Sequence, residues 1–308
     1  MSLQFILGNS GSGKSHYLYQ QIVNESMEHP EKNYLVLVPE QFTMQTQKDM
    51  IRISPGHGIM NVDVQSFVRL AFRVFSETGA GNVQVLDDLG KIMILKKVLS
   101  NKKDDLKYFG RNINKDGYIS EIKSFMSELI QYGADENEIE KMIQASENKT
   151  VLKYKLQDMS VAFSAFKEYI DKNYITSEEL LSVFADVISQ SGLLKGAVIC
   201  LDGFTGFTPL QYRLLRELIK IAEKVYITVT ADERESVINK GKNYQLFFMS
   251  RKTINNKRMI ASETGVEVLD DIWTGKEISQ TRFGSSKELE WLERNLFRYP
   301  YKRYNYSY

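Results

Sequence analysis

Residues 8–15 of this 308-residue chain match G-x-x-x-x-G-K-[ST], the pattern of a loop that wraps the phosphates of a nucleotide. An apolar run at residues 3–7 precedes the pattern and indicates a buried strand, while residues 16–23 lack Gly and Pro and indicate a helix. A strand, a glycine-rich loop and a helix in this order are the context that the pattern requires. The sequence therefore predicts an α/β fold with a nucleotide site formed by Gly8, Asn9, Ser10, Gly11, Ser12, Gly13, Lys14 and Ser15.

The residue types in this loop suit phosphate binding. Glycines at positions 8, 11 and 13 carry no Cβ, so the backbone can adopt positive φ and turn its N–H groups toward phosphate oxygens. Lys14 is expected to reach the β and γ phosphates, and the Ser15 hydroxyl is expected to ligate Mg²⁺. The positive end of the following helix then faces the anion.

Composition narrows the class of protein. The 40 Lys and Arg residues balance 39 Asp and Glu residues, so any contact with nucleic acid must come from a local patch of charge. The only cysteine, Cys200, excludes an internal disulfide and a cysteine-based metal site, and the three histidines have no ligand spacing. No stretch reaches the length of a membrane span and no room is left for a signal peptide, so a cytoplasmic protein is expected.

The pattern of apolar runs predicts a parallel sheet interrupted by a helical insertion. Further continuous apolar runs occupy residues 34–38, 59–64, 197–201 and 225–229, as in strands covered on both faces. Between the runs at 59–64 and 197–201, helical periodicity at residues 118–131 and a capping box at residues 176–179 indicate helices. We expect a nucleotide-binding domain split into residues 1–84 and 191–285, an all-helical insertion at 85–190, and the start of a linker at 286–308.

Asp202 follows the buried run 197–201 and is the candidate acidic residue for the Mg²⁺ shell, acting directly or through water. The next residue, Gly203, cannot polarise an attacking water as a glutamate there would. Loss of a positioned general base costs a factor of about 10²–10⁴ in rate. Nucleotide binding without rapid turnover is expected.

Three further stretches carry a family resemblance: residues 38–43 (VPEQFT), 65–73 (QSFVRLAFR) and 202–211 (DGFTGFTPLQ). Together with the glycine-rich loop they resemble the N-terminal, helicase-like domain of the B subunit of the AddAB-type ATP-dependent helicase/deoxyribonuclease, which is related to RexB. The likeness runs from Leu3 to about Phe297. It implies a RecA-like P-loop NTPase fold, domain 1A of a superfamily 1 helicase, in which the insertion corresponds to domain 1B.

The resemblance also implies a role. In that family the B subunit has lost motor activity and pairs with an AddA-type subunit that carries the motor; the complex resects double-strand breaks, recognises Chi and prepares ends for homologous recombination. The nuclease domain and the cysteines of the iron–sulfur cluster lie in later parts of a longer subunit. With one cysteine, this chain is expected to be an N-terminal fragment without nuclease activity or cluster.

Loops at the ends of the predicted strands are candidates for contact with single-stranded DNA. Polar groups there could bind bases or phosphates, and aromatic rings could stack on bases or pack in the core. The candidates are Gln41, Thr43, Phe67, Arg69, Phe72, Arg73, Phe204 and Phe207.

Two other functions stay open at this point. A small-molecule kinase would use Lys14 and Asp202 but needs an acceptor pocket and a lid arginine that the sequence does not reveal. A scaffold with a relic nucleotide site would use the insertion to bind a partner. The preference for adenine or guanine is also open, because no glutamine motif precedes the first strand.

Overall fold

The computed structural model describes residues 1–80, 84–110, 115–170, 174–234, 237, 242–275, 281–297, 300 and 302–304. The chain divides into two compact units: unit 1 is Met1–Leu70, Ser191–Phe207 and Leu215–Tyr308, and unit 2 is Ala71–Gln190 and Thr208–Leu214. We keep the division into a nucleotide-binding domain, an inserted domain and a linker as a proposal. Of the predicted linker, residues 298–299, 301 and 305–308 lie outside the described residues.

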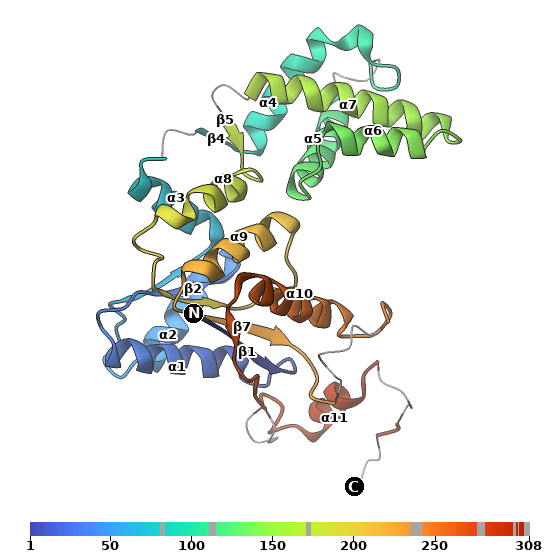
Figure 1. Cartoon of the computed structure of the whole chain (residues 1–308). Coiled ribbons are helices and arrows are strands. Elements are labelled where there is room, and N and C mark those ends of the chain that lie inside the picture. The colour runs from blue at the N-terminus through green and yellow to red at the C-terminus, as the bar shows by residue number, and fades with distance from the viewer. Residues whose placement is uncertain are drawn as a thin grey trace. The chain divides into compact units, whose positions relative to one another are not determined.

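A parallel sheet forms the centre of unit 1 (Figure 1). Its strands follow the order β3-β2-β6-β7-β1-β8, and β9 also pairs with β1. All five apolar runs predicted as strands are confirmed, whereas β8 and β9 are two-residue strands that no periodicity could reveal. The bounds are β1 Ser2–Gly8, β2 Tyr34–Leu37, β3 Val62–Gln65, β6 Val198–Leu201, β7 Lys224–Thr230, β8 Glu267–Val268 and β9 Ile272–Trp273.

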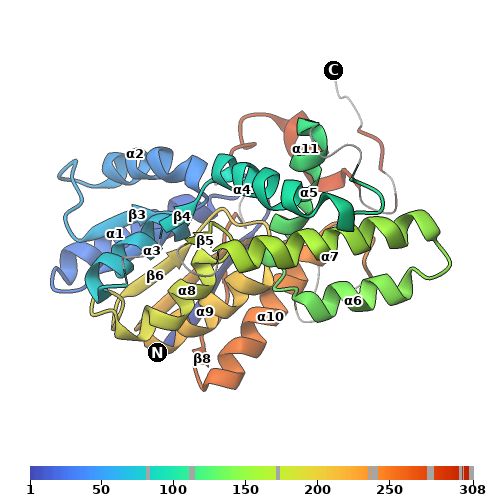
Figure 2. The same cartoon turned by 90° about the horizontal axis from the view of Figure 1, so that it is seen from above.

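Helices cover both faces of this sheet (Figures 1 and 2). On one face, Ile6, Val36 and Cys200 pack with Leu18 and Ile22 of the first helix. On the other face, the Phe5 ring lies 5.6 Å from the guanidinium of Arg258 in α10. Burial on both faces explains why the strands are continuously apolar. The helices that lie wholly in unit 1 are α1 Lys14–Glu28, η1 Glu40–Phe42, α2 Thr43–Ile53, α10 Phe248–Thr264 and α11 Lys287–Asn295. Two further helices, α3 Phe67–Thr78 and α9 Pro209–Ile221, have residues in both units.

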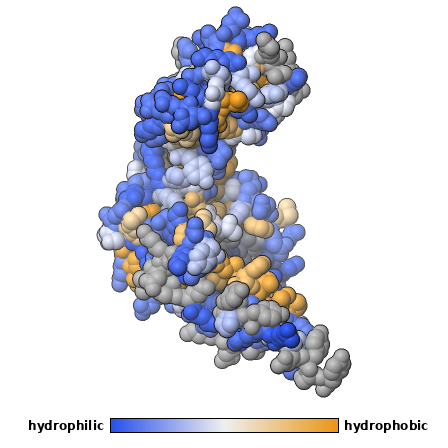
Figure 3. Space-filling view, turned by 90° about the vertical axis from the view of Figure 1, so that its right-hand side faces the viewer, coloured by the Kyte–Doolittle hydropathy of each residue, from blue (hydrophilic) through white to orange (hydrophobic). Residues whose placement is uncertain are grey.

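Unit 2 has its own apolar core, in which Leu99, Ile119, Ile139 and Phe166 are at most 1% exposed. Its surface on the face shown in Figure 3 is largely hydrophilic. The expectation of an all-helical insertion is wrong, because β4 and β5 form a parallel two-stranded sheet; strands of three residues are too short to show a period. The elements are β4 Gln84–Leu86, α4 Asp88–Asn101, η2 Lys103–Asp105, α5 Asp116–Gln131, α6 Glu136–Ala145, α7 Thr150–Ile170, β5 Tyr174–Thr176, α8 Leu180–Val187 and η3 Ile188–Gln190.

The predicted capping box at residues 176–179 is confirmed. The Thr176 N–H donates to Glu179 Oε2 at 3.0 Å, and the Glu179 N–H donates to Thr176 Oγ1 at 3.2 Å, immediately before α8. Among the described residues, no helix is long and apolar enough to cross a membrane.

Lys257 of α10 carries an amine into the core of unit 1. Its side chain is fully buried, and its Nζ has no hydrogen-bond partner in the described part of the chain. The amine lies 3.6 Å from the centre of the Phe207 ring. Burial lowers the pKa of Lys257 well below its ordinary value, because the charged form loses its hydration. Holding this amine in the core costs folding free energy at neutral pH.

The unfolded chain binds a proton at Lys257 up to a pH of about 10.4, whereas the native amine releases it at lower pH. The free energy of unfolding is therefore expected to rise with pH between the native pKa and that value, and to be lowest below the native pKa. Lys257→Met should raise the free energy of unfolding at pH 7 by about 1–3 kcal/mol and should flatten the rise between pH 7 and 10. Urea titration followed by tryptophan fluorescence reports unit 1 alone, because Trp273 and Trp291 both belong to it. A less stable Lys257→Met variant at pH 7 would contradict this account.

Candidate functional site

The glycine-rich loop has the backbone that the sequence predicts. Gly11 and Gly13 have φ of 78° and 86°, in the left-handed region, and Gly8 has φ of 158°. Gly13 is the N-cap of α1 and provides no side-chain cap, so the start of this helix is open to an external acceptor. The loop therefore places a helix N-terminus at the carboxyl end of β1, where parallel sheets bind their ligands.

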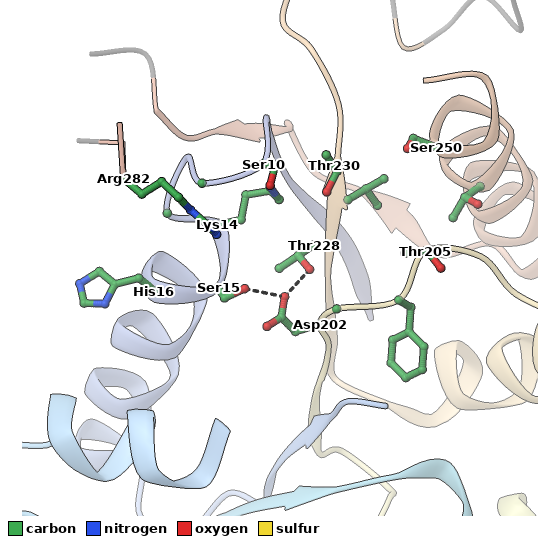
Figure 4. Close-up of a pocket in the computed structure, with 16 residues that line it drawn as sticks. Ser10, Lys14, Ser15, His16, Asp202, Thr205, Thr228, Thr230, Ser250 and Arg282 are labelled. Atoms are coloured by element: carbon green, nitrogen blue, oxygen red, sulfur yellow. Dashed lines mark hydrogen bonds between the residues drawn. The ribbon is translucent and has the colours of Figure 1, made fainter. Parts of the chain in front are cut away.

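Asp202 lies at the carboxyl end of β6, is 4% exposed, and accepts hydrogen bonds from three hydroxyl groups. Ser15 Oγ donates to Oδ1 over 3.0 Å, Thr228 Oγ1 donates to the same oxygen, and the Tyr19 hydroxyl donates to Oδ2. Figure 4 shows Ser15 and Thr228 converging on the carboxylate. The structure thus brings together the two residues that the sequence singled out for a metal ion, Ser15 and Asp202.

Tyr19 and Thr228 were missed by the sequence analysis, although each has a positional signal. Tyr19 follows Ser15 by four residues on α1, so both side chains lie on one face of the helix. Thr228 comes directly after Ile227, the register partner of Leu201, so it is level with Asp202 on the neighbouring strand.

Lys14 folds back on its own loop, and its Nζ donates to the Asn9 carbonyl oxygen over 2.7 Å. Burial lowers the pKa of Lys14 to about 8; the Asp202 carboxylate opposes this shift, and the nearby Arg282 guanidinium adds to it. The ammonium group has no carboxylate in direct contact among the described residues, so an anionic ligand would supply its missing counter-charge.

A cavity of about 560 Å³ opens beside these groups, all of them in unit 1. It is lined by the glycine-rich loop, by the segment after β6, by the end of β7, and by Ser250 and Thr253 of α10 (Figure 4). Within the described residues no group of three His, Cys, Asp or Glu side chains could hold a metal by itself. Ser15 and Asp202 offer two oxygen donors, and Mg²⁺ in nucleotide sites takes its remaining ligands from waters and phosphates. These residues therefore fit Mg²⁺ bound together with a nucleotide.

Residues from the last quarter of the described chain lie against the same loop. The Thr274 N–H donates to the Leu7 carbonyl over 2.8 Å, and the hydroxyls of Thr274 and Ser12 are 2.9 Å apart. The Arg282 N–H donates to the Gly11 carbonyl over 3.0 Å. No local pattern could reveal these contacts, because they join residues that are more than 250 positions apart.

The polar DNA candidates of unit 1 differ in accessibility. Gln41 is exposed on η1. Arg69 is 62% exposed, and its Nε lies 3.7 Å from Glu40 Oε1. Thr43, in contrast, is 8% exposed, and its hydroxyl donates to the Glu40 carbonyl over 2.9 Å. Thr43 therefore stabilises the start of α2 and has no free hydroxyl to offer a ligand.

Three of the four aromatic candidates, Phe67, Phe204 and Phe207, form a cluster. Phe67 is 6% exposed, its ring centre lies 5.2 Å from that of Phe204, and Phe204 lies 5.2 Å from Phe207. Packing in the core accounts for Phe67. Phe72, which is 46% exposed, and the exposed Arg73 belong to unit 2.

Comparisons with known proteins agree on one family. The profile of the family described as "ADDB, N-terminal" matches residues 5–293. Proteins named as the B subunit of an ATP-dependent helicase/deoxyribonuclease are similar to the chain over nearly its whole length: 45% identity over 99% of the chain in Lachnoclostridium phytofermentans, 34% over 99% in Clostridium novyi and 35% over 98% in Clostridium tetani. The chain spans 27%, 26% and 26% of these relatives, respectively.

The close approach of Gly275 to the loop generates a steric prediction. A Cβ at Gly275 would lie 2.6 Å from Ser12 Cβ, whereas a Cβ at Gly196, which has the same φ of 73°, would meet nothing within 4 Å. Both alanine variants place a side chain in the left-handed region, at about 1–2 kcal/mol. Gly275→Ala should be less stable than Gly196→Ala by at least a further 1 kcal/mol or so, in urea titrations followed by tryptophan fluorescence. An equal loss of unfolding free energy in both variants would show that Gly275 is not in close contact with Ser12.

Proposed function

The chain belongs to the AddB N-terminal family, and from this premise we propose that it is the Mg²⁺–ATP-binding and single-stranded-DNA-binding region of the B subunit of an ATP-dependent helicase/deoxyribonuclease. Its α/β unit would then be a RecA-like P-loop NTPase domain. The observation that carries the proposal is the 3.0 Å hydrogen bond between Ser15 and Asp202 beside a loop with left-handed glycines.

Each residue has a defined part in this proposal. The loop N–H groups and Lys14 bind phosphate oxygens, and Ser15 and Asp202 hold the ion. Bound Mg²⁺ would neutralise charge on the phosphates. The hydroxyls of Tyr19 and Thr228 orient the Asp202 carboxylate by hydrogen bonds to both of its oxygens.

Slow turnover is part of the proposal and rests on Gly203. Position 203 has no side chain that could act as a base. Its φ of 77° would also strain the backbone of a glutamate placed there. Without a positioned base, hydrolysis loses a factor of about 10²–10⁴. We therefore propose binding with little ATPase activity.

The remaining parts of the proposal concern the longer protein. The relatives are named as one subunit of a helicase/deoxyribonuclease, so we propose that the chain acts with an AddA-type partner subunit and with DNA in break repair. The chain covers about a quarter of these relatives, and we propose that nuclease activity and any iron–sulfur cluster belong to parts outside it.

The nucleotide prediction concerns Lys14. Mg²⁺–ATP should raise the thermal unfolding temperature of the chain, and Lys14→Ala should abolish the shift. Because the free site has a Lys14 pKa of about 8 and bound phosphate raises it, binding should take up a proton and weaken by up to about tenfold per pH unit above pH 8. Calorimetry in buffers of different ionisation enthalpy measures the proton uptake.

Alternative functions make different predictions in the same experiments. No shift with Mg²⁺–ATP, or a shift that Lys14→Ala retains, would contradict the proposal and favour a scaffold with a relic loop. Transfer of phosphate to a nucleoside would favour the kinase. Hydrolysis at a motor-like rate by the chain alone would contradict the role assigned to Gly203.

The DNA prediction concerns Arg69. Arg69→Glu should weaken binding of a single-stranded oligonucleotide and lower the slope of log affinity against log salt, since each lost phosphate contact on a single strand removes about 0.7 from the slope. Arg52→Glu is the matched control, because Arg52 is 74% exposed and lies 3.5 Å from Asp49 in a pair like that of Arg69 and Glu40. Equal effects of both variants in anisotropy titrations at two salt concentrations would show only a general charge effect.

A further inference from the structure

Lysine side chains of unit 2 lie against tyrosine rings toward both ends of α7, which packs beside α4 (Figure 1). Near the end of α7, Lys97 Nζ lies 5.0 Å from the centre of the Tyr169 ring and donates to the hydroxyl of that ring over 3.1 Å. Near its start, Lys107 Nζ lies 5.7 Å from the centre of the Tyr154 ring and donates to Gln157 Oε1 over 3.1 Å. Tyr154 and Tyr169 are fifteen positions apart on the helix, which is about 22 Å along its axis and about 60° around it. The two pairs therefore share one flank of α7.

A third pair joins this flank with the roles of helix and loop exchanged. Lys155 of α7 lies 4.9 Å from the centre of the Tyr108 ring. The loop that carries Tyr108 is fixed to α7 by Asp158, which is 2% exposed and accepts hydrogen bonds from the backbone N–H groups of residues 107–109 over 2.7–2.8 Å. The Asp158 carboxylate thus anchors the loop from beneath, through its backbone, and leaves the ammonium groups at the surface.

The lysines of this flank carry charge that unit 2 does not neutralise by direct contact. In the described part of the chain, no carboxylate forms an ion pair with Lys97, Lys107 or Lys155. Residues 96–107 and 149–158 together hold eight lysines against three aspartates. The first turn of α6, in contrast, is acidic. Charge in unit 2 is segregated, and the uncompensated positive flank indicates an anionic partner.

We propose that this flank binds the phosphate backbone of duplex DNA, at a site separate from the loops of unit 1. The proposal rests on the proposed function for the choice of DNA as the anion, and it adds a second DNA site to that function. We call the site the lysine–tyrosine face, which is formed by Lys97, Lys107, Tyr108, Tyr154, Lys155 and Tyr169.

The contacts of the tyrosine rings favour a duplex over a single strand. Sites for single strands stack bases on open aromatic faces. Here Tyr108, Tyr154 and Tyr169 are 38–41% exposed, and an ammonium group already lies over each ring. A duplex keeps its bases stacked inside and offers phosphates to a surface that contacts the backbone alone. The distance of about 22 Å between the outer pairs corresponds to about six base-pair steps of roughly 3.4 Å.

The rings also prepare the lysines for binding. A lysine side chain is flexible, and fixing it on a phosphate costs conformational entropy. A cation–π contact restricts the side chain before DNA binds, while the ammonium keeps N–H groups that can donate to phosphate oxygens. Binding through such lysines is expected to be independent of base sequence and strongly dependent on salt.

Two double variants with the same loss of charge test the proposal. Lys107→Gln with Lys155→Gln removes two ammonium groups of the lysine–tyrosine face, whereas Lys141→Gln with Lys220→Gln removes two lysines that form ion pairs. In anisotropy titrations with a blunt duplex, the first variant should bind at least about tenfold more weakly than wild type, and its slope of log affinity against log salt should be smaller by up to about 1.8. The second variant should bind as wild type does. Relaxed circular plasmid, which has no ends, should compete with the duplex.

Two further measurements separate charge from packing. Lys107→Arg with Lys155→Arg keeps both charges and should retain the wild-type affinity for duplex; a loss as large as that of the glutamine variant would overturn the role of charge. Melting of the glutamine variant, followed by far-UV circular dichroism, should match that of wild type, because the loop is anchored through backbone N–H groups. A lower melting temperature with a wild-type affinity for duplex would assign the two lysines to packing and overturn the proposal.

The outcomes also separate this proposal from the one on which it rests. If the glutamine variant binds duplex as the control variant does, or if wild type binds no duplex, the proposal is overturned, and Arg69→Glu alone decides the single-strand site. An equal loss of affinity for duplex and for a single strand would overturn the assignment to duplex. Unchanged duplex binding with lost binding of a purified AddA-type subunit would assign the face to a protein and overturn the proposal. Loss of duplex affinity with unchanged single-strand affinity supports it, even if Arg69→Glu has no effect.

Discussion

The buried carboxylate of Asp202 is the interaction on which the site depends. A carboxylate that is 4% exposed loses most of its hydration, and three hydroxyl donors replace that water. The donors come from α1 and β7, while Asp202 directly follows β6, so the hydrogen bonds connect three elements at the carboxyl end of the sheet. The arrangement that makes burial of the charge tolerable is also the one that places Ser15 and Asp202 side by side. Stability and ligand geometry at this end have the same origin.

The other side of the glycine-rich loop is held by residues from late in the chain. Thr274 bonds to Leu7 and lies within hydrogen-bond distance of Ser12, and Arg282 bonds to Gly11. The loop therefore lies between a core carboxylate and these late residues, and neither side is complete without groups that are hundreds of positions away. Like the pairing of β1 with β7, these contacts close loops of more than 200 residues, so the site and the sheet both depend on the tertiary fold and not on local sequence.

Sequence reasoning succeeded where the signal is local and long enough. Strands such as 34–38 and 197–201 are continuous apolar runs, the glycine spacing at 8–15 predicts a turn before a helix, and Asp202 follows a predicted strand directly. It failed where tertiary contacts determine the local structure or the neighbours of a residue. Two- and three-residue strands carry no period, and the contacts of Thr274 and Arg282 have no local signature. Thr43 shows the same limit on a finer scale: its sequence position resembles a ligand-binding loop, yet its hydroxyl bonds back to η1 and is buried.

The glycine at 203 is explained by the path of the chain as well as by chemistry. Its φ of 77° turns the backbone after Asp202 so that Phe204 packs on Phe67 and Phe207, and the Phe207 ring in turn covers the buried amine of Lys257. A glutamate at this position would face backbone strain, although its Cβ would make only ordinary van der Waals contacts, 3.6 Å from Pro39 and 3.9 Å from Phe42. A glutamate here would therefore carry the strain of a left-handed backbone, about 1–2 kcal/mol, if residues 203–207 kept their path. The glycine at 203 is thus tied to the packing of unit 1, because the same backbone turn places Phe204 against Phe67 and Phe207.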